Sequence, residues 1–176
     1  MSHLFIDIPS YLSTHHRLKD AIEGLDEKQL KWKAAPDKWS VTEVLSHLAD
    51  HNLIVSFRIR EILAGTTAVL PGFNQNNWVN GTNANNGAAT DILDLFQALL
   101  VYNSLLFSRL SAADWEKSAV NFKGETVSLA VVVKAFIEHV GHHIGQIDRI
   151  KSSLSLFNCH KEGVITNGIG ELDNYS

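Results

Sequence analysis

The chain has 176 residues, 45% of them hydrophobic, so it is long enough to form one domain around a substantial core. Its formal net charge is −4, its pI is about 6.1, and its lysines and arginines are scattered singly. The basic surface that drives nucleic-acid binding is therefore missing, and we expect no nucleic-acid partner.

Targeting signals are not evident in the sequence. Residues 1–7 lack the basic stretch and apolar core of a signal peptide, and no run approaches the roughly 18 apolar residues of a membrane span. Cys159 is the single cysteine, which excludes an internal disulfide and is usual in a reducing compartment. We therefore expect a cytoplasmic protein that contacts no membrane.

The first predicted helix covers about residues 9–24, where apolar side chains recur at helical spacing before Gly24. Asp26 and Gln29 then indicate a short capped turn, and a loop at residues 34–38 leads into the second helix. This first segment contributes one amphipathic helix to the fold.

The second predicted helix covers residues 40–64. Ser40 and Glu43 have the spacing of a capping box, and Trp39 and Val44 can form a hydrophobic staple around it. Its apolar positions trace one stripe, formed by Val41, Val44, Leu45, Leu48, Val55, Ile59 and Ile62.

Two histidines lie on this helix. The stripe places His51 nearer to its centre than His47, so periodicity alone slightly favours His51 as the inward-facing residue. Gly65 then ends the helix.

Residues 65–89 form a connection much longer than usual, with seven asparagines and four glycines. Phe73 and Trp78 are expected to pin it to the body of the protein. A loop of this length is either functional or a plain crossover that makes its flanking helices parallel, and both interpretations can hold.

The third predicted helix covers residues 91–110, with Thr90 as its N-cap. A short turn near Ser111 and another at Gly124 precede the fourth helix, which begins near Ser128. The sequence thus predicts an all-α protein, a four-helix bundle with a long crossover between the second and third helices.

We place this bundle in residues 1–155 and a C-terminal tail in residues 156–176. The tail is rich in glycine and asparagine and shows no helical stripe. We expect it to be extended, or a strand-like arm that packs on a partner subunit.

The fourth helix carries two histidines at metal-ligand spacing. His139 and His143 are four residues apart, with Cβ atoms roughly 5–6 Å apart on a helix face, so both rings could reach one ion at about 2.0–2.1 Å. His143 lies in the apolar stripe, His139 and Gln146 lie on its edge, and His142 points to the polar side. Such pairs also occur by chance, and a third ligand elsewhere would favour a metal site.

The order of these motifs resembles the DinB/YfiT-like superfamily. The motifs are the Trp-Ser pair before a helix with His-Leu-Ala-Asp at residues 47–50, the long loop that holds Pro71 to Trp78, and His-x-x-His-His-x-x-Gln at residues 139–146. The resemblance covers most of residues 8–153.

In that family the first ligand is the histidine of the Val-Leu-x-His-Leu-Ala-Asp stretch, which matches His47. The other two ligands match His139 and His143. The resemblance thus implies a site formed by these three histidines, with His51 as the rival first ligand.

Three neutral histidines leave an ion with an open position, as in catalytic sites. Imidazole suits zinc, nickel, iron and copper, and we expect zinc or nickel. Gln146 could hydrogen-bond a ligand histidine or a bound water, or it could be a core-edge amide. Asp50 and Glu138 point to other faces, so the sequence supplies no general base and no other catalytic residue.

The resemblance implies two chemistries, namely metal-dependent transfer of a low-molecular-weight thiol such as bacillithiol onto electrophiles, and isomerase or hydrolase reactions. We expect a thiol S-transferase or hydrolase-like enzyme that acts on a small molecule. The alternative is a non-enzymatic metal-binding bundle with a structural or sensing role. We also expect a homodimer, and we expect Trp78 of the long loop to help cover the site.

Overall fold

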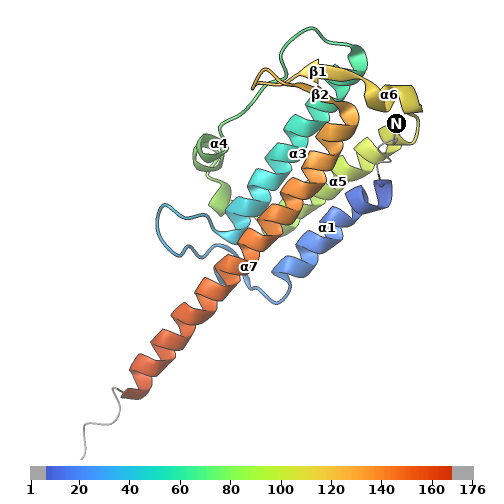
Figure 1. Cartoon of the computed structure of the whole chain (residues 1–176). Coiled ribbons are helices and arrows are strands. Elements are labelled where there is room, and N and C mark those ends of the chain that lie inside the picture. The colour runs from blue at the N-terminus through green and yellow to red at the C-terminus, as the bar shows by residue number, and fades with distance from the viewer. Residues whose placement is uncertain (1–6, 168–176) are drawn as a thin grey trace, which may run out of the picture.

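The structure is a computed structural model that describes residues 7–167, with side chains to residue 160. Helices form most of the described chain (Figure 1). In chain order the elements are α1 (Ile8–Ile22), α2 (Glu27–Leu30), α3 (Val41–Ala64), α4 (Gln75–Gly81), the 3₁₀ helix η1 (Ala84–Asn86), α5 (Ala89–Phe107), α6 (Ala112–Glu116), β1 (Ser118–Val120), β2 (Thr126–Ser128) and α7 (Leu129–Asn167).

Four long helices, α1, α3, α5 and α7, form the bundle, in which α3 and α1 each pack against both α5 and α7. In Figure 1, α3 and α5 run in the same direction, while α1 and α7 run in the opposite one. The chain between α3 and α5 therefore returns along the bundle. The predicted four-helix bundle with its long crossover is confirmed.

Local signals in the sequence set the ends of α3. The backbone N–H of Glu43 donates to the Ser40 hydroxyl at 3.1 Å, and the Glu43 carboxylate accepts from the backbone N–H of Ser40 at 2.8 Å. Gly65 ends the helix in the left-handed region, with φ of 73°, where glycine carries no steric penalty. All seven apolar positions of the predicted stripe are buried.

The start of α5 differs from the prediction. Its N-cap is Ala88, which has no side chain able to cap, and Thr90 lies within the helix. The preceding turn, in which the Gly87 N–H donates to the Ala84 carbonyl, already directs the chain into the helix. Asp91 lies in the first turn, where a negative charge stabilises the exposed N–H groups.

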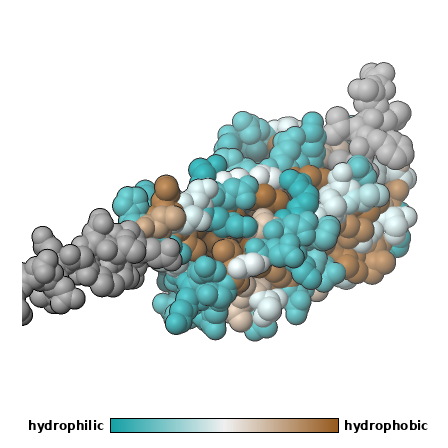
Figure 2. Space-filling model, turned by 90° about the horizontal axis from the view of Figure 1, so that it is seen from below, coloured by the Kyte–Doolittle hydropathy of each residue, from teal (hydrophilic) through white to brown (hydrophobic). Residues whose placement is uncertain are grey.

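Among the described helices, α5 alone has a length and hydropathy that would also suit a membrane span. Its Phe96, Leu100 and Phe107 side chains are buried in the bundle core. The opposite face, continued by α3, is apolar and exposed, and it includes Leu53, Phe57, Leu95, Val101, Tyr102 and Leu105. Figure 2, seen from below, likewise shows hydrophobic residues exposed among hydrophilic ones.

A small antiparallel hairpin of β1 and β2 precedes α7 and was not predicted. Strands of three residues are too short to show an alternating pattern in the sequence. The predicted turn at Gly124, with φ of 81°, joins them. Leu70 of the crossover donates its N–H to the Val120 carbonyl at 2.8 Å, which ties the crossover to the hairpin.

The last helix is much longer than predicted. α7 has 39 residues, continues to Asn167 and projects beyond the bundle (Figure 1). The expected extended or strand-like arm is therefore wrong for residues 156–167, and residues 168–176 lie outside the described part. Extending a formed helix needs no new nucleation, and the rings of Trp32 and Phe157 pack 5.8 Å apart at the base of the projection.

Candidate metal centre

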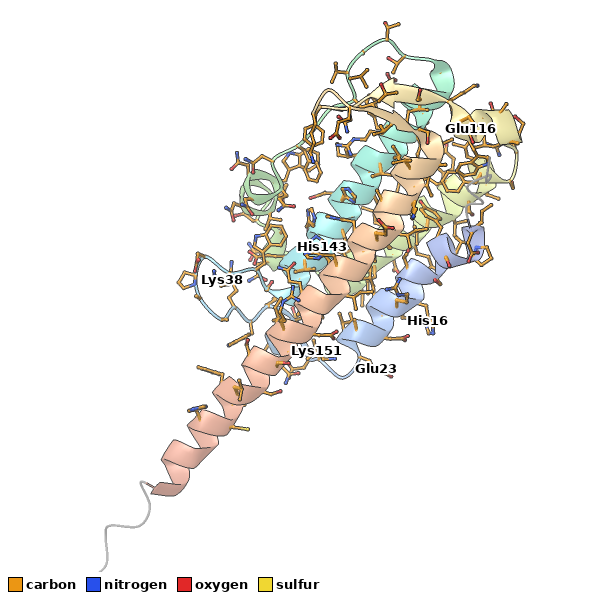
Figure 3. The ribbon with its side chains drawn as sticks, in the orientation of Figure 1. His16, Glu23, Lys38, Glu116, His143 and Lys151 are labelled. Atoms are coloured by element: carbon orange, nitrogen blue, oxygen red, sulfur yellow. The ribbon has the colours of Figure 1, made fainter. Side chains whose placement is uncertain are left out.

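Three histidines from two helices converge inside the bundle. The Nε2 atoms of His47 on α3 and His139 on α7 are 3.0 Å apart. With His143, one candidate ligand atom from each ring lies within 4.8 Å of the other two. In Figure 3, His143 lies where α7 crosses α3, whereas His16 of α1 lies on the outer side of the bundle. The structure thus brings together the three residues that the sequence motif singled out.

Burial keeps these rings neutral. His47 is 1% exposed and His143 is 6% exposed, while His139 is half-buried. Burial, reinforced by the neighbouring histidines, lowers the pKa of His47 to about 3 and that of His139 to about 4. It also lowers the pKa of His143, although the hydrogen bond to Gln146 opposes this shift. Near neutral pH the rings therefore offer the lone pairs that a metal ion requires.

The surroundings orient these rings. Nδ1 of His143 lies 2.7 Å from Oε1 of Gln146. Because an amide oxygen can only accept, Nδ1 carries the proton and the lone pair lies on Nε2. The expected hydrogen bond between Gln146 and a site histidine is thus present, with His143 as the donor. Trp39, which was expected only to staple α3, packs 5.2 Å from the His47 ring and stacks 6.4 Å from the His143 ring.

The residues fit a divalent ion. Two nitrogens that each lie about 2.0–2.1 Å from a tetrahedral ion are roughly 3.3 Å apart, close to the 3.0 Å between Nε2 of His47 and Nε2 of His139. Without an ion, only one of these two nitrogens can donate to the other, and Nδ1 of His47 is buried without a partner among the described residues.

His51 lies beside the cluster but outside it. Its ring is 4.1 Å from the His139 ring and stacks 5.8 Å from Phe136. Burial lowers its pKa to about 2. Periodicity favoured His51 over His47 as the inward-facing residue, but His47 is 1% exposed whereas His51 is half-buried. The packing of α7 against α3 determines which histidine of α3 faces His139 and His143, and the sequence of α3 alone does not reveal this packing. In the structure this histidine is His47.

The crossover covers this site, as predicted. The Phe73 ring lies 6.0 Å from the His47 ring and 6.2 Å from the His51 ring, and Trp78 packs 5.0 Å from Phe73. Phe73 is therefore the closer cover and Trp78 supports it. At the other end of the crossover, the Ser40 hydroxyl donates to the Asn85 side-chain oxygen at 2.6 Å.

Two carboxylates near the ligands in sequence lie apart from the cluster, as expected. Glu138 is exposed and lies 3.8 Å from Lys134. Asp50 is half-buried, and burial raises its pKa. Neither belongs to the cluster, so no general base is assigned.

A pocket of about 230 Å³ adjoins the cluster through His139. His51, Arg58 and Phe136 also line it, and the hairpin supplies Phe122 at its rim. Sequence reasoning missed Arg58 because its proximity to the pocket depends on long-range packing. Its position seven residues, or about two turns, after His51 on the same helix face was the available signal.

Comparisons with known proteins agree with this arrangement. The profile of the DinB superfamily matches residues 11–147. A "putative metal-dependent hydrolase" of Bacillus licheniformis is 29% identical over 133 residues, which are 75% of this chain and 76% of that protein. A similarly named protein of Geobacillus thermodenitrificans is 23% identical over 146 residues, or 80% of this chain and 82% of that protein.

Two solved structures share the fold. YfiT from Bacillus subtilis, described as a probable metal-dependent hydrolase with an unusual four-helix bundle topology, superposes with a TM-score of 0.77 at 21% identity. The match covers 84% of this chain and 85% of YfiT. The mycothiol-dependent maleylpyruvate isomerase superposes with a TM-score of 0.62 at 10% identity, over 81% of this chain and 61% of that one. The family match, which spans most of the chain, shows that this protein belongs to the DinB superfamily.

Proposed function

We propose that the chain is a metal-dependent enzyme that acts on a small molecule, with His47, His139 and His143 as the ligands of one divalent ion. The observation that carries this proposal is the convergence of three neutral imidazoles within 4.8 Å, next to a pocket. Relatives named as metal-dependent hydrolases support it.

Zinc or nickel is the proposed ion, since both suit imidazole ligands. When bound, the ion would supply Lewis acidity, which favours the ionised form of a water or thiol at its open position. Gln146 holds His143 in the tautomer that presents Nε2. Trp39 and Phe73 pack against the rings and limit the access of bulk water.

The proposed reaction is transfer of a low-molecular-weight thiol to an electrophile, or a hydrolase-like reaction. The mycothiol dependence of one protein with a similar fold supports thiol chemistry. Within the described residues the cluster has three members, and closed structural sites hold their ion with four. This favours catalysis over the alternative, a bundle with a structural or sensing ion.

We further propose that the protein is a cytoplasmic homodimer that binds neither nucleic acid nor membrane. The exposed apolar face of α3 and α5 supports a protein partner. The net charge of −4 supports the absence of nucleic acid. Light scattering that shows only a 19.5 kDa species would contradict the dimer.

The function can be tested by loading the protein with zinc or nickel and following thiol consumption against a panel of electrophiles. Low-molecular-weight thiols, including bacillithiol, are the donors. His143→Ala should abolish metal binding and turnover. His142→Ala is the matched control, because His142 is the exposed neighbour outside the cluster.

Metal-dependent consumption that His143→Ala abolishes and His142→Ala retains would support a thiol S-transferase. Metal-dependent hydrolysis of a test ester or amide with the same variant pattern would support the hydrolase. A wild-type protein that is inactive in both assays, yet unfolds when the ion is chelated, would show a structural ion and end the enzyme proposal.

A further inference from the structure

The pocket beside the cluster is small and mostly apolar. Its volume of about 230 Å³ lies below the roughly 300–1,000 Å³ of pockets for drug-sized ligands. Val131, Val132 and Phe136 of α7 form much of its wall, and His139 joins it to the three-histidine cluster. A ligand in this pocket would thus be small, with an apolar body that reaches toward His139.

Among the residues that the structure describes, Arg58 is the one cationic side chain that lines this pocket. Its Nε and Nη2 atoms both donate to the backbone carbonyl of Pro71, at 3.1 and 2.6 Å. The guanidinium carbon lies 5.8 Å from the centre of the Phe122 ring. Gly72 permits this packing, because a Cβ atom there would lie 2.9 Å from Cγ of Phe122. The crossover and the hairpin together fix the guanidinium in place.

The charge of Arg58 is not neutralised. In the described part of the chain no carboxylate lies within 4.0 Å of it, and its hydrogen-bond acceptor is an uncharged carbonyl. Half-burial lowers the pKa of Arg58, and its charge contributes to the lowered pKa of His51. Charged groups removed from water are normally paired with an opposite charge. Arginine has five N–H donors, so donors remain for an anion.

We propose that this pocket binds a small organic carboxylate, with the carboxylate on Arg58 and the apolar body against α7, pointing toward His139. A fixed, planar guanidinium matches the two oxygens of a carboxylate. The inference deepens the proposed function by naming its substrate class, and it rests on that function for the reaction. Binding itself requires no metal ion.

The test is a calorimetric titration of the full chain, metal-free and zinc-loaded, with benzoate, its neutral isostere benzamide, and phenylphosphonate. We expect benzoate to bind the metal-free wild type at least about tenfold more tightly than benzamide, because hydrogen bonds to charged groups are the strong ones. Arg58→Gln should reduce benzoate affinity to that of benzamide, and Arg58→Lys should restore part of the difference.

Arg109→Gln is the matched control, since Arg109 is exposed and does not line the pocket. Thermal unfolding of each variant checks that the crossover remains folded. The comparison of benzoate with benzamide in the wild type needs no variant, so it stands even if Arg58→Gln misfolds.

Equal binding of benzoate and benzamide would overturn the proposal. So would benzoate binding that requires zinc and survives Arg58→Gln, since the carboxylate would then lie on the ion. If phenylphosphonate binds through Arg58 and benzoate does not bind, the proposed carboxylate ligand is wrong and the pocket binds a phosphorus oxyanion. A chain that binds benzoate through Arg58 but holds no metal would contradict the proposed function and leave this inference intact.

Discussion

Nδ1 of His143 donates to Oε1 of Gln146, one turn further along α7, at 2.7 Å. This hydrogen bond selects the tautomer in which the lone pair lies on Nε2. Gln146 therefore acts on the candidate metal site through the orientation of a histidine rather than by direct contact with an ion.

Replacing Gln146 by Leu should weaken metal affinity by about 10–100-fold, because outer partners of ligand histidines have effects of this size. Gln146→Glu should retain or increase affinity, since a carboxylate is a stronger acceptor. Competition with a chromophoric chelator measures both variants. Unchanged affinity in Gln146→Leu would mean that packing alone orients the ring.

The two histidines of α3 should differ in their effect on metal content. His47→Ala should lose the ion, because His47 is the α3 member of the cluster, whereas His51→Ala should retain it. Elemental analysis of the purified variants measures the metal content of each. The reverse pattern would make His51 the first ligand.

A buried polar network outside the site should contribute strongly to stability. The Asn103 side-chain amide donates to the Tyr11 hydroxyl at 3.1 Å and to the Ser56 hydroxyl at 2.7 Å, and its oxygen accepts from Arg60 at 3.0 Å. Asn103→Ala leaves the buried hydroxyls of Tyr11 and Ser56 without this partner, while Arg60 keeps its hydrogen bond to the Ser56 carbonyl, so the change should cost about 2 kcal/mol. Urea unfolding measures the loss. Gln97→Ala, at an exposed position of α5, is the control and should change stability little.

Stability should also fall at alkaline pH through Tyr11. Burial raises the pKa of its hydroxyl from 10.0 to about 12. The folded state favours the neutral phenol. The contribution of Tyr11 to the free energy of unfolding is therefore fully present below pH 10 and is lost as the pH rises toward 12. It amounts to at most about 2.7 kcal/mol.

The absorbance of phenolate at increasing pH measures the Tyr11 ionisation directly. One of the three tyrosines should titrate late, and Tyr11→Phe should remove that step. A single transition for all tyrosines near pH 10 would contradict the prediction.

Much of the fold could be predicted because local sequence signals determine where helices begin and end and which face of each is buried. The capping box at Ser40 and Glu43 and the left-handed Gly65 set the ends of α3, and apolar spacing gave the buried face. Thr90 misled the prediction for α5, because the preceding turn rather than a side-chain cap starts that helix. The β1–β2 hairpin was missed because its strands are too short to show a period.

The site was predictable where ligand spacing lies within one helix, as for His139 and His143. The third member needed the family resemblance, since the periodicity of α3 favoured His51. Phe73 was expected to anchor the crossover, but its contact with the His47 ring was not predicted, and Arg58 was missed. Both contacts depend on how the crossover lies across the bundle.

The crossover also has a minimum length. The 24 residues of α3 span about 36 Å. Roughly 11 extended residues are enough to cover this distance on the way back to α5. Residues 65–88 are roughly twice that number. The excess includes α4 and carries Phe73 over the histidines and Trp78 against Phe73. A shortened crossover could therefore preserve the topology of the bundle while leaving its histidines open to solvent. The length needed to connect α3 to α5 and the length needed to shield the site are thus separate properties of this segment.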